Sequence, residues 1–336
     1  MSKPQPTEFD VLFLRQRGVK YPRWHLTAPI RRDTRVRLSY GASVSGSDLI
    51  GKQMLERTVD DKGNTVAVYE PTLASYIVNS DRVATPIYPS DAVTIVSLLD
   101  LHPVRPGEED EGQPDDGPFE VFEAGTGMGS LSLHIARALH AANPPVPAPY
   151  LADIDFHVGT VGDYVAARLA ASGGRPVFAR AVLDLPAAHE DAVAAALVPA
   201  LHDNAVLVLF YPSISQIAEF QAWALESGAP LRLEKVLEMP TTSTADGVRD
   251  GGCGGRHWDV KIIKPKPARA EEEEEVTGED AACDGPATES EPVVVMRPKV
   301  GGRVAGGGFV AVYRKWPAGT NHQQPEEPEA DSEAEA

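Results

Sequence analysis

Cysteine is scarce in this chain, and long apolar runs are absent. Only Cys253 and Cys283 occur in 336 residues, too few for a metal cluster or a disulfide framework, so a reducing intracellular compartment is expected. No run of about 18 apolar residues is present, so we expect no segment that spans a membrane. The nine histidines are scattered and form no ligand pair at i, i+4, so no metal site is predicted.

The first ten residues give little sign of targeting. They include Glu8 and Asp10 and lack an apolar centre, so no secretory signal is expected. A mitochondrial presequence should be rich in Arg and Ser and poor in acids, so the segment supports one poorly. The compartment stays undecided between mitochondrion and nucleus.

Acidic residues are concentrated in three stretches that contain no base. Residues 107–116 carry 6 acids, residues 271–293 carry 10 and residues 325–336 carry 6. The formal net charge of −18 comes from these stretches, because the rest of the chain has 27 acidic and 31 basic residues. Their richness in Pro, Gly and Ala predicts disorder, so the folded part is mildly basic and compatible with a nucleic-acid partner.

The segment from Arg15 to Arg37 is strongly basic. It holds eight Lys and Arg residues against one acid, Asp33, with Tyr21 and Trp24 among them. Lys and Arg neutralise phosphates and aromatic rings stack on bases, so the segment is either an RNA-facing surface or an ordinary solvated face. Short alternating runs at 35–38 and 65–69, separated by turn signals, predict a small β domain over residues 30–80.

A strand, a glycine-rich turn and a helix follow one another in residues 119–139. The apolar run 119–122 is typical of a buried parallel strand, and from Ser130 onward the apolar residues share one helical face. The turn between them contains Gly125, Gly127 and Gly129. Glycines let the backbone approach a ligand, and a helix N-terminus offers unpaired N–H groups. Such a corner fits a dinucleotide or S-adenosylmethionine (SAM), and it also fits a tight turn without a ligand.

The residues of the corner favour SAM. Glu123-Ala124-Gly125-Thr126-Gly127-Met128-Gly129-Ser130 resembles the first motif of class I SAM-dependent methyltransferases, in which E-x-G-x-G-x-G holds the methionine part of the cofactor. With the segments below, the chain resembles one family, the catalytic subunit of tRNA (adenine-58-N1) methyltransferase. The resemblance implies an α/β fold with a Rossmann-like class I sheet after a small N-terminal β domain. The cofactor-binding residues that it implies are Glu123, Gly125, Thr126, Gly127, Met128, Gly129, Ser130, Leu131, Thr160 and Val161.

Three further segments resemble motifs of this family, and in two of them the family's motif contacts the target adenine. Residues 85–91 resemble its I-Y-P-K-D segment, whose tyrosine, here Tyr88, lies beside the base. They lead into an apolar helix, for which Ser90 or Asp91 is the expected N-cap. Residues 181–186 are predicted as a strand that ends at Asp184, and they resemble the family's L-D-x-P. Residues 211–217 resemble its P-x-x-x-Q turn and follow a predicted buried strand at 206–210.

The resemblance assigns catalysis to Asp184, Tyr88 and Tyr211. Methylation of adenine N1 needs no proton removed beforehand, because N1 presents a lone pair. A carboxylate at Asp184 that accepts from the exocyclic amine would stabilise the cationic product, and the two tyrosines would stack on the flipped base. Taken alone, Asp184 is as readily a turn-forming residue before proline, and Tyr88 a packing aromatic at a helix entry.

The chain departs from the family after the first helix, which should end near Asn143. A second strand with a ribose-binding acid and a second helix are expected there, but the space before Ile154 is too short. Residues 154–161 resemble the third strand, which would put Thr160 where an adenine-contacting Asp is expected. They could instead be the second strand, with Asp153 or Asp155 as the ribose acid and residues 160–171 as its helix. One strand–helix unit is missing in either case.

The remaining segments complete the predicted organisation. Residues 187–201 are predicted as helix, and residues 256–263 and 307–313 as the closing antiparallel hairpin. We expect a basic segment and small β domain at 1–82, a methyltransferase domain at 83–316 with an acidic insertion at 264–298, and a disordered acidic tail at 317–336.

The predicted function is transfer of a methyl group from SAM to N1 of adenine 58 in the T-loop of tRNA. The family resemblance also implies a tetramer, either a homo-oligomer or a hetero-oligomer with a non-catalytic tRNA-binding subunit. The competing hypothesis is that this chain is itself a non-catalytic subunit or degenerate paralogue, which the missing unit and Thr160 would favour. A nucleotide-binding dehydrogenase fits poorly, because nothing resembles hydride-transfer machinery.

Overall fold

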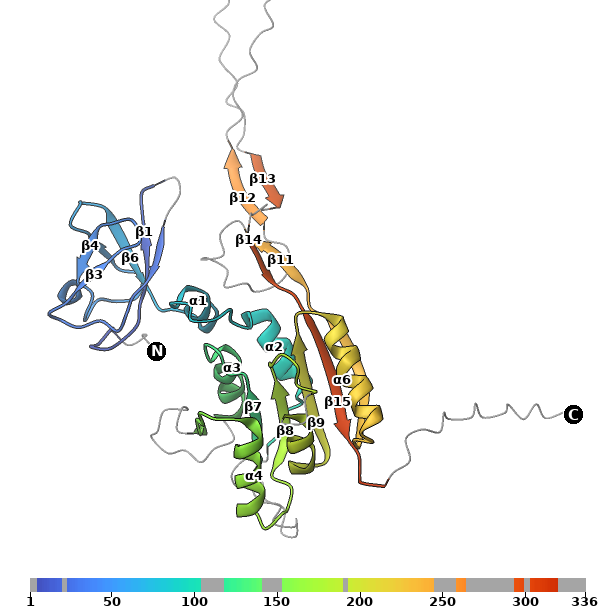
Figure 1. Cartoon of the computed structure of the whole chain (residues 1–336). Helices are drawn as coiled ribbons and strands as arrows, with labels where there is room; N and C mark the ends of the chain where they lie inside the picture. The colour runs from blue at the N-terminus through green and yellow to red at the C-terminus, as the bar shows by residue number, and fades with distance from the viewer. Residues whose placement is uncertain are drawn as a thin grey trace, which may run out of the picture.

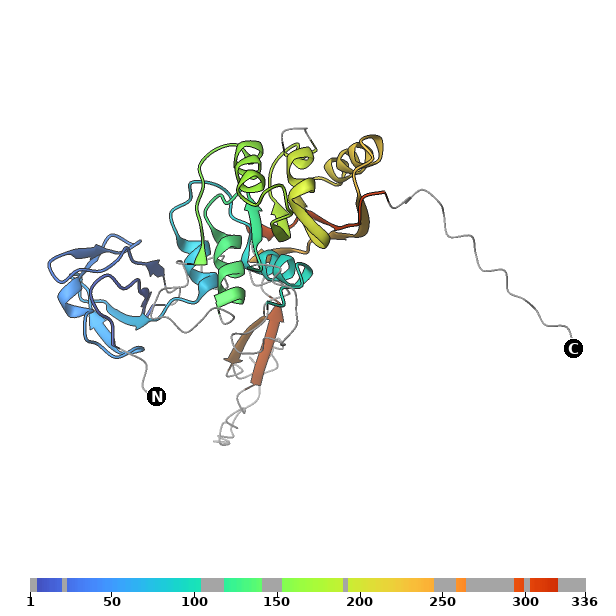
Figure 2. The ribbon, with the colours of Figure 1, turned by 90° about the horizontal axis from the view of Figure 1, so that it is seen from below.

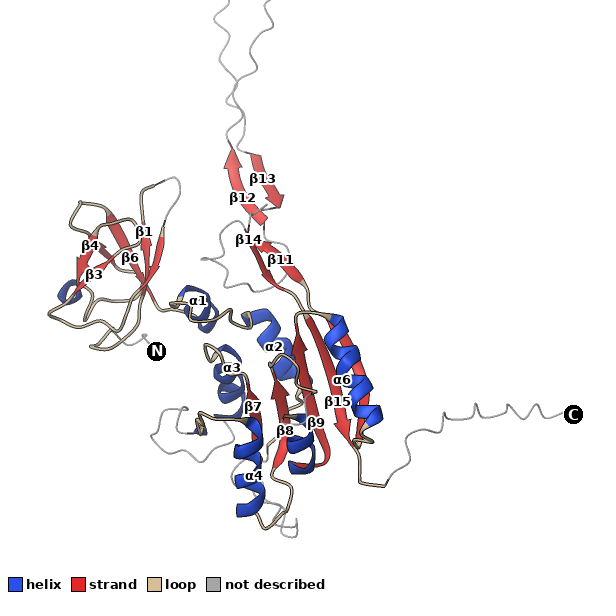
Figure 3. Cartoon of the chain, viewed as in Figure 1, coloured by secondary structure: helices blue, strands red, loops and turns tan. Residues whose placement is uncertain are grey.

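The computed structural model describes residues 5–19, 23–103, 118–140, 153–189, 193–244, 258–263, 293–298 and 303–319 (Figure 1). An N-terminal β domain leads through two helices into a mixed sheet with helices on both faces (Figure 3). A view from below shows the same N-terminal domain beside the sheet (Figure 2). No helix in the described ranges is long and apolar enough to cross a membrane.

The N-terminal domain is a small antiparallel β structure, as predicted, and begins earlier than residue 30. Its four-stranded sheet has the order β2-β1-β6-β5, and a separate pair joins β3 to β4. The strands are β1 (Phe13–Gln16), β2 (Trp24–Leu26), β3 (Arg35–Arg37), β4 (Ser43–Ser45), β5 (Arg57–Val59) and β6 (Thr65–Tyr69). Alternation puts Leu12, Leu14, Val66 and Val68 into a common core. The runs predicted at 35–38 and 65–69 are therefore confirmed.

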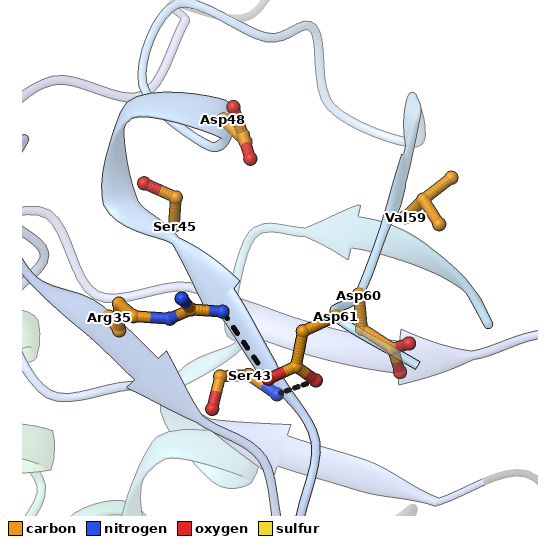
Figure 4. A pocket seen from close by; sticks show the side chains of 7 residues that line it. All are labelled: Arg35, Ser43, Ser45, Asp48, Val59, Asp60 and Asp61. Atoms are coloured by element: carbon orange, nitrogen blue, oxygen red, sulfur yellow. Dashed lines mark hydrogen bonds and ion pairs between the residues drawn. The ribbon is translucent and has the colours of Figure 1, made fainter. Parts of the chain in front are cut away.

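A polar hollow lies on this domain beside β4 and β5 (Figure 4). Its carboxylates are largely engaged by the chain. Asp60 accepts from Asn64 N at 2.8 Å and from the Tyr40 hydroxyl at 2.9 Å. Asp61 accepts from Ser43 N at 2.8 Å and pairs with Arg35 at 3.3 Å. The Asp60 bonds hold the turn between β5 and β6, and the Asp61 bonds tie this turn to β3 and β4, so both carboxylates serve the fold of the domain.

Two helices connect the domains. Helix α1 (Leu73–Asn79) begins at Thr72, whose side chain accepts from Ser75 N. Helix α2 (Pro89–Leu98) begins earlier than expected: its N-cap is Tyr88, two residues before Ser90, and Pro89 takes the first helical position. The prediction of Ser90 or Asp91 as N-cap is wrong, because a proline at this position pre-sets the helical φ and lacks the N–H that would need a cap.

The central sheet has the order β10-β15-β9-β8-β7. Strands β7 (Val121–Ala124), β8 (Phe178–Leu183) and β9 (Leu201–Tyr211) are parallel, whereas β15 (Phe309–Lys315) runs antiparallel between β9 and β10 (Leu231–Glu238). Helices α2 and α3 (Ser130–Leu139) pack on one face. Helices α4 (Val161–Ala171), α5 (Ala194–Leu197) and α6 (Ile214–Glu226) pack on the other. The α/β class is confirmed.

The strand predicted at 154–161 is wrong. Residues 154–159 have no regular structure, and Val161–Ala171 is helix α4, as the alternative interpretation of residues 160–171 expected. The alternating apolar residues do not enter the core: Phe156 is 68% and Val158 is 100% exposed. Thr160 starts the helix, because its side chain accepts from Asp163 N at 3.1 Å. Within the described residues, β7 is therefore the edge of the sheet.

The helix predicted at 187–201 is much shorter. Only α5 and the following 3₁₀ turn Val198–Ala200 form among the described residues, and β9 begins at Leu201 instead of Val206. Ala187 has a left-handed φ of 54°, which stops a right-handed helix from starting there. Pro199 lies within the 3₁₀ turn and ends helical pairing.

The closing hairpin pairs differently from the prediction. Strand β15 pairs with β10, while β12 (Trp258–Ile263) pairs with β13 (Val293–Pro298). A further ribbon joins β11 (Thr241–Thr244) to β14 (Arg303–Gly306), and Figure 1 shows both ribbons leading away from the sheet. Strand β13 thus lies inside the range 264–298 expected as the acidic insertion, and it meets the stretch 271–293 predicted to be disordered only at Val293. Residues 264–292 and 320–336 lie outside the described residues, so their predicted disorder stays a prediction.

Candidate active site

The glycine corner folds as its sequence predicts. Strand β7 ends at Ala124, and α3 begins at Ser130 with Gly129 as its N-cap. All three glycines are left-handed, with φ of 92° at Gly125, 51° at Gly127 and 75° at Gly129. Only glycine adopts this conformation without strain, so the turn depends on these residues. Residues of this turn and the start of α3 line the same small pocket. The unpaired amides of a helix N-terminus suit an anionic or carboxylate group there.

Gly125 and Asp184 bring two strand ends into contact. A Cβ on Gly125 would lie 2.1 Å from the carbonyl oxygen of Asp184 and 2.8 Å from its carbonyl carbon. The main-chain N–H of Asp184 donates to the carbonyl of Ala124 at 2.9 Å. Parallel strands place their carboxyl ends at one edge of the sheet, so β7 and β8 deliver Gly125 and Asp184 to the same place.

The pocket at this edge draws on three segments that are distant in the sequence. Its lining residues are Thr85, Pro86, Ile87, Glu123, Gly125, Thr126, Gly127, Met128, Ser130, Leu131 and Asp184. The hydroxyl of Ser130 donates to the carbonyl of Ile87, which ties the segment before α2 to the start of α3. Of the predicted cofactor-binding residues, all those from Glu123 to Leu131 except Gly129, the N-cap of α3, line the pocket. Asp184 lies among them.

The pocket contains two carboxylates whose ionisation is disfavoured. Burial raises the pKa of Asp184 to about 6. Burial also raises the pKa of Glu123, and the negative charge of Asp184 acts in the same direction. Above about pH 6, Asp184 is therefore a charged hydrogen-bond acceptor in a poorly hydrated place, where electrostatic interactions are stronger than in water. Such a carboxylate suits contact with an amine or a cation.

Tyr88 adjoins the residues that line the pocket but is not one of them. It follows Ile87 directly, is half-buried and caps α2. The guanidinium carbon of Arg82 lies 5.9 Å from the centre of its ring. The predicted role of Tyr88 beside the base is compatible with this position, and it stays a prediction.

The predicted stacking role of Tyr211 does not agree with the structure. Its exposed fraction is 0%, and its ring belongs to the core between the sheet and helices α5 and α6. Burial raises the pKa of its hydroxyl to about 12. Along β9, Val206, Val208 and Phe210 face α2 and α3, whereas Leu207, Leu209 and Tyr211 face away. Tyr211 is the last residue of β9, as predicted, but its side chain lies on the face of the sheet opposite to α2 and α3, because side chains alternate between the two faces along a strand.

Thr160 and Val161 also differ from their predicted role. Thr160 is exposed and bonds to Asp163 as the cap of α4. Neither residue lines the pocket beside the glycine corner. Without a strand at 154–161, nothing directs Thr160 to that edge of the sheet. The wall formed by Thr85, Pro86 and Ile87 was not predicted as part of the site, although these residues adjoin Tyr88 in the segment that carried the resemblance.

The comparisons with known proteins agree with this geometry. No protein-family profile matches the chain. Two tRNA (adenine(58)-N(1))-methyltransferases TrmI, from two strains of Thermus thermophilus, are each 30% identical over 222 residues, which cover 61% of this chain and 72% of the relative. The chain belongs to this family. A SAM-dependent O-methyltransferase from Thermotoga maritima shares the fold, with a TM-score of 0.53 and 14% identity over 96% of this chain and 97% of that one.

The residues of the corner fit the cofactor that this methyltransferase family uses. The main chain at Gly125 can approach a ligand because it has no side chain, and a Cβ there has no room. The amides at the start of α3 suit the carboxylate of a methionine moiety, and Glu123 suits its ammonium group. No cluster of metal-ligating side chains is present in the part of the chain that the structure describes.

Proposed function

We propose that this chain transfers a methyl group from SAM to N1 of adenine 58 in the T-loop of tRNA. The observation that carries the proposal is the contact between the glycine corner and Asp184. It sets a cofactor-binding turn and a half-buried carboxylate against one pocket. Family membership supplies the substrate, because the related TrmI proteins are tRNA (adenine(58)-N(1))-methyltransferases.

The cofactor supplies an electrophilic methyl group on a sulfonium centre. Residues Gly125 to Leu131 would hold its methionine part through main-chain amides, and Glu123 would accept from its ammonium group. Asp184 would accept a hydrogen bond from the exocyclic amine of adenine. This bond draws the amine toward a negative charge and stabilises the positive charge that develops when N1 is methylated. No proton has to leave before attack, so the chain contributes position and electrostatics.

Tyr88 would provide the face on which the base lies. Adenine N1 is inaccessible in a stacked or paired base, so the base must leave its stack, and an aromatic face compensates part of that cost. An electron-rich ring also favours the cationic product. Arg82, beside Tyr88, would contact the adjoining phosphate.

The tRNA would also contact the N-terminal β domain. Arg23, Arg31, Arg32, Arg35 and Arg37 are exposed there. Trp24 is not available for stacking on a base, because its ring stacks on Phe13 at 4.7 Å and lies 5.1 Å from Tyr69. The proposed contact is therefore to phosphates through arginine, and replacing Arg32 and Arg37 should weaken binding to every tRNA sequence and reduce its salt dependence.

Assembly and location are separate proposals. We propose a tetramer, either of this chain alone or with a non-catalytic tRNA-binding subunit, on the strength of the family resemblance. Sedimentation of the purified chain, alone and with tRNA, tests it, and a stable monomer with full activity would contradict it. We propose a compartment that holds tRNA, mitochondrion or nucleus, which imaging of the tagged chain would decide.

The function is tested with purified protein, SAM and two tRNA transcripts that differ only in having adenine or guanine at position 58. Methyl incorporation is expected with the first transcript alone, and mapping should place it on N1. Calorimetry with S-adenosylhomocysteine distinguishes the second candidate, a non-catalytic subunit. That candidate is favoured by the absence of a strand between α3 and β8 in the described residues. A protein that binds tRNA but gives no heat of binding with S-adenosylhomocysteine would support this candidate.

A further inference from the structure

Arg180 is a buried cation that is bonded to main-chain carbonyls. It lies in β8, and its exposed fraction is 7%. Its Nε donates to the carbonyl of Leu99 at 2.6 Å, and a terminal nitrogen donates to the carbonyl of Asp100 at 3.1 Å. Its guanidinium carbon lies 5.3 Å from the centre of the Phe119 ring. Within the described residues no carboxylate lies at ion-pair distance from Arg180. Its charge is balanced by carbonyls at the C-terminal end of α2.

Helix α2 is therefore fixed at both ends. At its C-terminal end, Arg180 holds Leu99 and Asp100. At its N-terminal end, the carbonyl of Ile87 accepts from Ser130 at the start of α3. Between these points Ala92 and Ile95 pack with Val182 of β8 in one core. The helix is a rigid element between the glycine corner and the body of the sheet.

The same face of β8 carries both Arg180 and Asp184. Val182 faces α2 and α3, whereas Ala181 and Leu183 face the opposite side. Alternation therefore puts Arg180, Val182 and Asp184 on the α2 face. From Arg180 to Asp184 the strand advances about 13 Å, and the ten residues of α2 span about 15 Å. A helix anchored at Arg180 thus delivers Tyr88, its N-cap, to the end of the strand where Asp184 lies.

We propose that Arg180 is a positioning residue for the reaction, which sets the distance between Tyr88 and Asp184 by holding the C-terminal end of α2. This inference rests on the proposed function, because it gives Tyr88 and Asp184 their roles. Arg180 touches no reacting group itself. It acts through α2, and the wall formed by Thr85, Pro86 and Ile87 should move with the same helix.

The variants are Arg180→Met, which removes the bonds, and Arg180→Lys, which keeps the charge but cannot bond both carbonyls in the same way. The matched control is Lys315→Met. Lys315 is another buried cation of the sheet, 8% exposed, and its bonds go to β9, where it donates to the carbonyl of Leu201 and pairs with Asp203 at 3.5 Å. The two methionine variants should lose a similar amount of stability. A difference between their methylation rates therefore reports on the position of α2.

We expect Arg180→Met to lower the single-turnover rate by about a hundredfold, as misplacement of a catalytic group by about 1 Å can do, whereas Lys315→Met stays near the wild-type rate. Arg180→Lys should recover part of the loss. In a Tyr88→Ala background the same Arg180 substitution should cost less than about threefold, because distant sites couple only through a shared element. The proposal would be overturned if the Arg180 and Tyr88 substitutions had additive effects on the rate, or if the Arg180 and Lys315 variants lost equal activity. Full activity of Tyr88→Ala would also overturn it.

A second readout does not require activity. Amide hydrogen exchange of residues 85–98 should accelerate in Arg180→Met and not in Lys315→Met, and affinity for S-adenosylhomocysteine should fall severalfold in the former alone. Failure of the proposed function would appear as a wild-type protein that methylates no tRNA. Failure of the Arg180 inference would appear as unchanged exchange in α2 and unchanged affinity.

Discussion

Gly125 leaves no room for a side chain against the carbonyl of Asp184: an added Cβ would lie 2.1 Å from that oxygen. The glycine that opens the cofactor turn therefore packs on the main chain of the residue whose carboxylate is assigned to the base. A side chain added at position 125 would therefore displace the main chain at Asp184, whereas a change confined to the Asp184 carboxylate leaves this contact in place.

Gly125→Ala should abolish both SAM binding and methylation. The new Cβ meets main-chain atoms that cannot rotate away, and the φ of 92° strains any other residue. Gly173→Ala is the control, because Gly173 has a φ of 68° and nothing within 4 Å. Calorimetry with S-adenosylhomocysteine and thermal unfolding measure the two variants, and normal cofactor binding by Gly125→Ala would contradict the assigned corner.

Asp184→Asn should slow methylation with little effect on SAM affinity. The amide keeps the shape but loses a charge-assisted bond, worth roughly 1.5–3 kcal/mol, which corresponds to about a ten- to hundredfold slower single turnover. Equal rates would remove Asp184 from the chemistry. Loss of SAM affinity together with the rate would assign it to the cofactor instead.

The rate should depend on pH through Asp184. Since burial raises its pKa to about 6, the carboxylate loses its charge as the pH falls through about 6. The single-turnover rate at saturating SAM should then fall about tenfold for each further pH unit. Asp184→Asn should show no such step, and a step that persists in this variant would assign it to another group, Glu123 first.

Tyr211→Phe should leave methylation unchanged, because the ring is buried on the face of the sheet opposite to Asp184. Tyr88→Ala should lower the rate by about five- to 150-fold, as loss of a stacking interaction of about 1–3 kcal/mol would. Both variants are measured on the same unmodified tRNA. A large loss in Tyr211→Phe with normal stability would return this residue to the site.

Asp91→Asn should change the pH dependence of stability. Asp91 is 1% exposed, and burial raises its pKa from 3.8 to about 6. The folded state therefore binds a proton at Asp91 more tightly than the unfolded state does. The wild-type unfolding free energy should fall by roughly 3 kcal/mol as the pH rises from the unfolded-state pKa of Asp91 to its folded-state pKa. The asparagine variant lacks this decrease. Urea denaturation at several pH values tests it, and parallel profiles would show that Asp91 is not buried as described.

Local signals predicted the parts of the site that lie within one segment. The glycine corner follows from Gly125, Gly127 and Gly129 between an apolar strand and an amphipathic helix, and Asp184 follows from its place at a strand end. The contact between Gly125 and Asp184 could not be predicted in the same way, because it depends on the pairing of β7 with β8, whose residues are far apart in the sequence.

Other differences between the predictions and the structure have physical reasons. The sequence correctly puts Tyr211 at the end of a strand, but the face of the sheet on which its side chain lies depends on where the alternation of β9 starts. Strand β10 has no clear alternating pattern in the sequence, because a bulge between Leu233 and Lys235 shifts its register. Residues 154–161 have the apolar alternation of a strand, but a strand needs a neighbour, and Thr160 begins α4 instead.

The position of β15 has a consequence for the nascent chain. This strand is the last of the sheet to be synthesised, yet it lies between β9 and β10. At about 5–20 residues per second, the ribosome needs on the order of 4–15 s to proceed from Glu238 to Lys315. Throughout that interval β9 and β10 each expose an unpaired edge, and such edges recruit other chains. Newly made molecules of this enzyme should therefore depend on chaperone protection until residue 315 has left the exit tunnel.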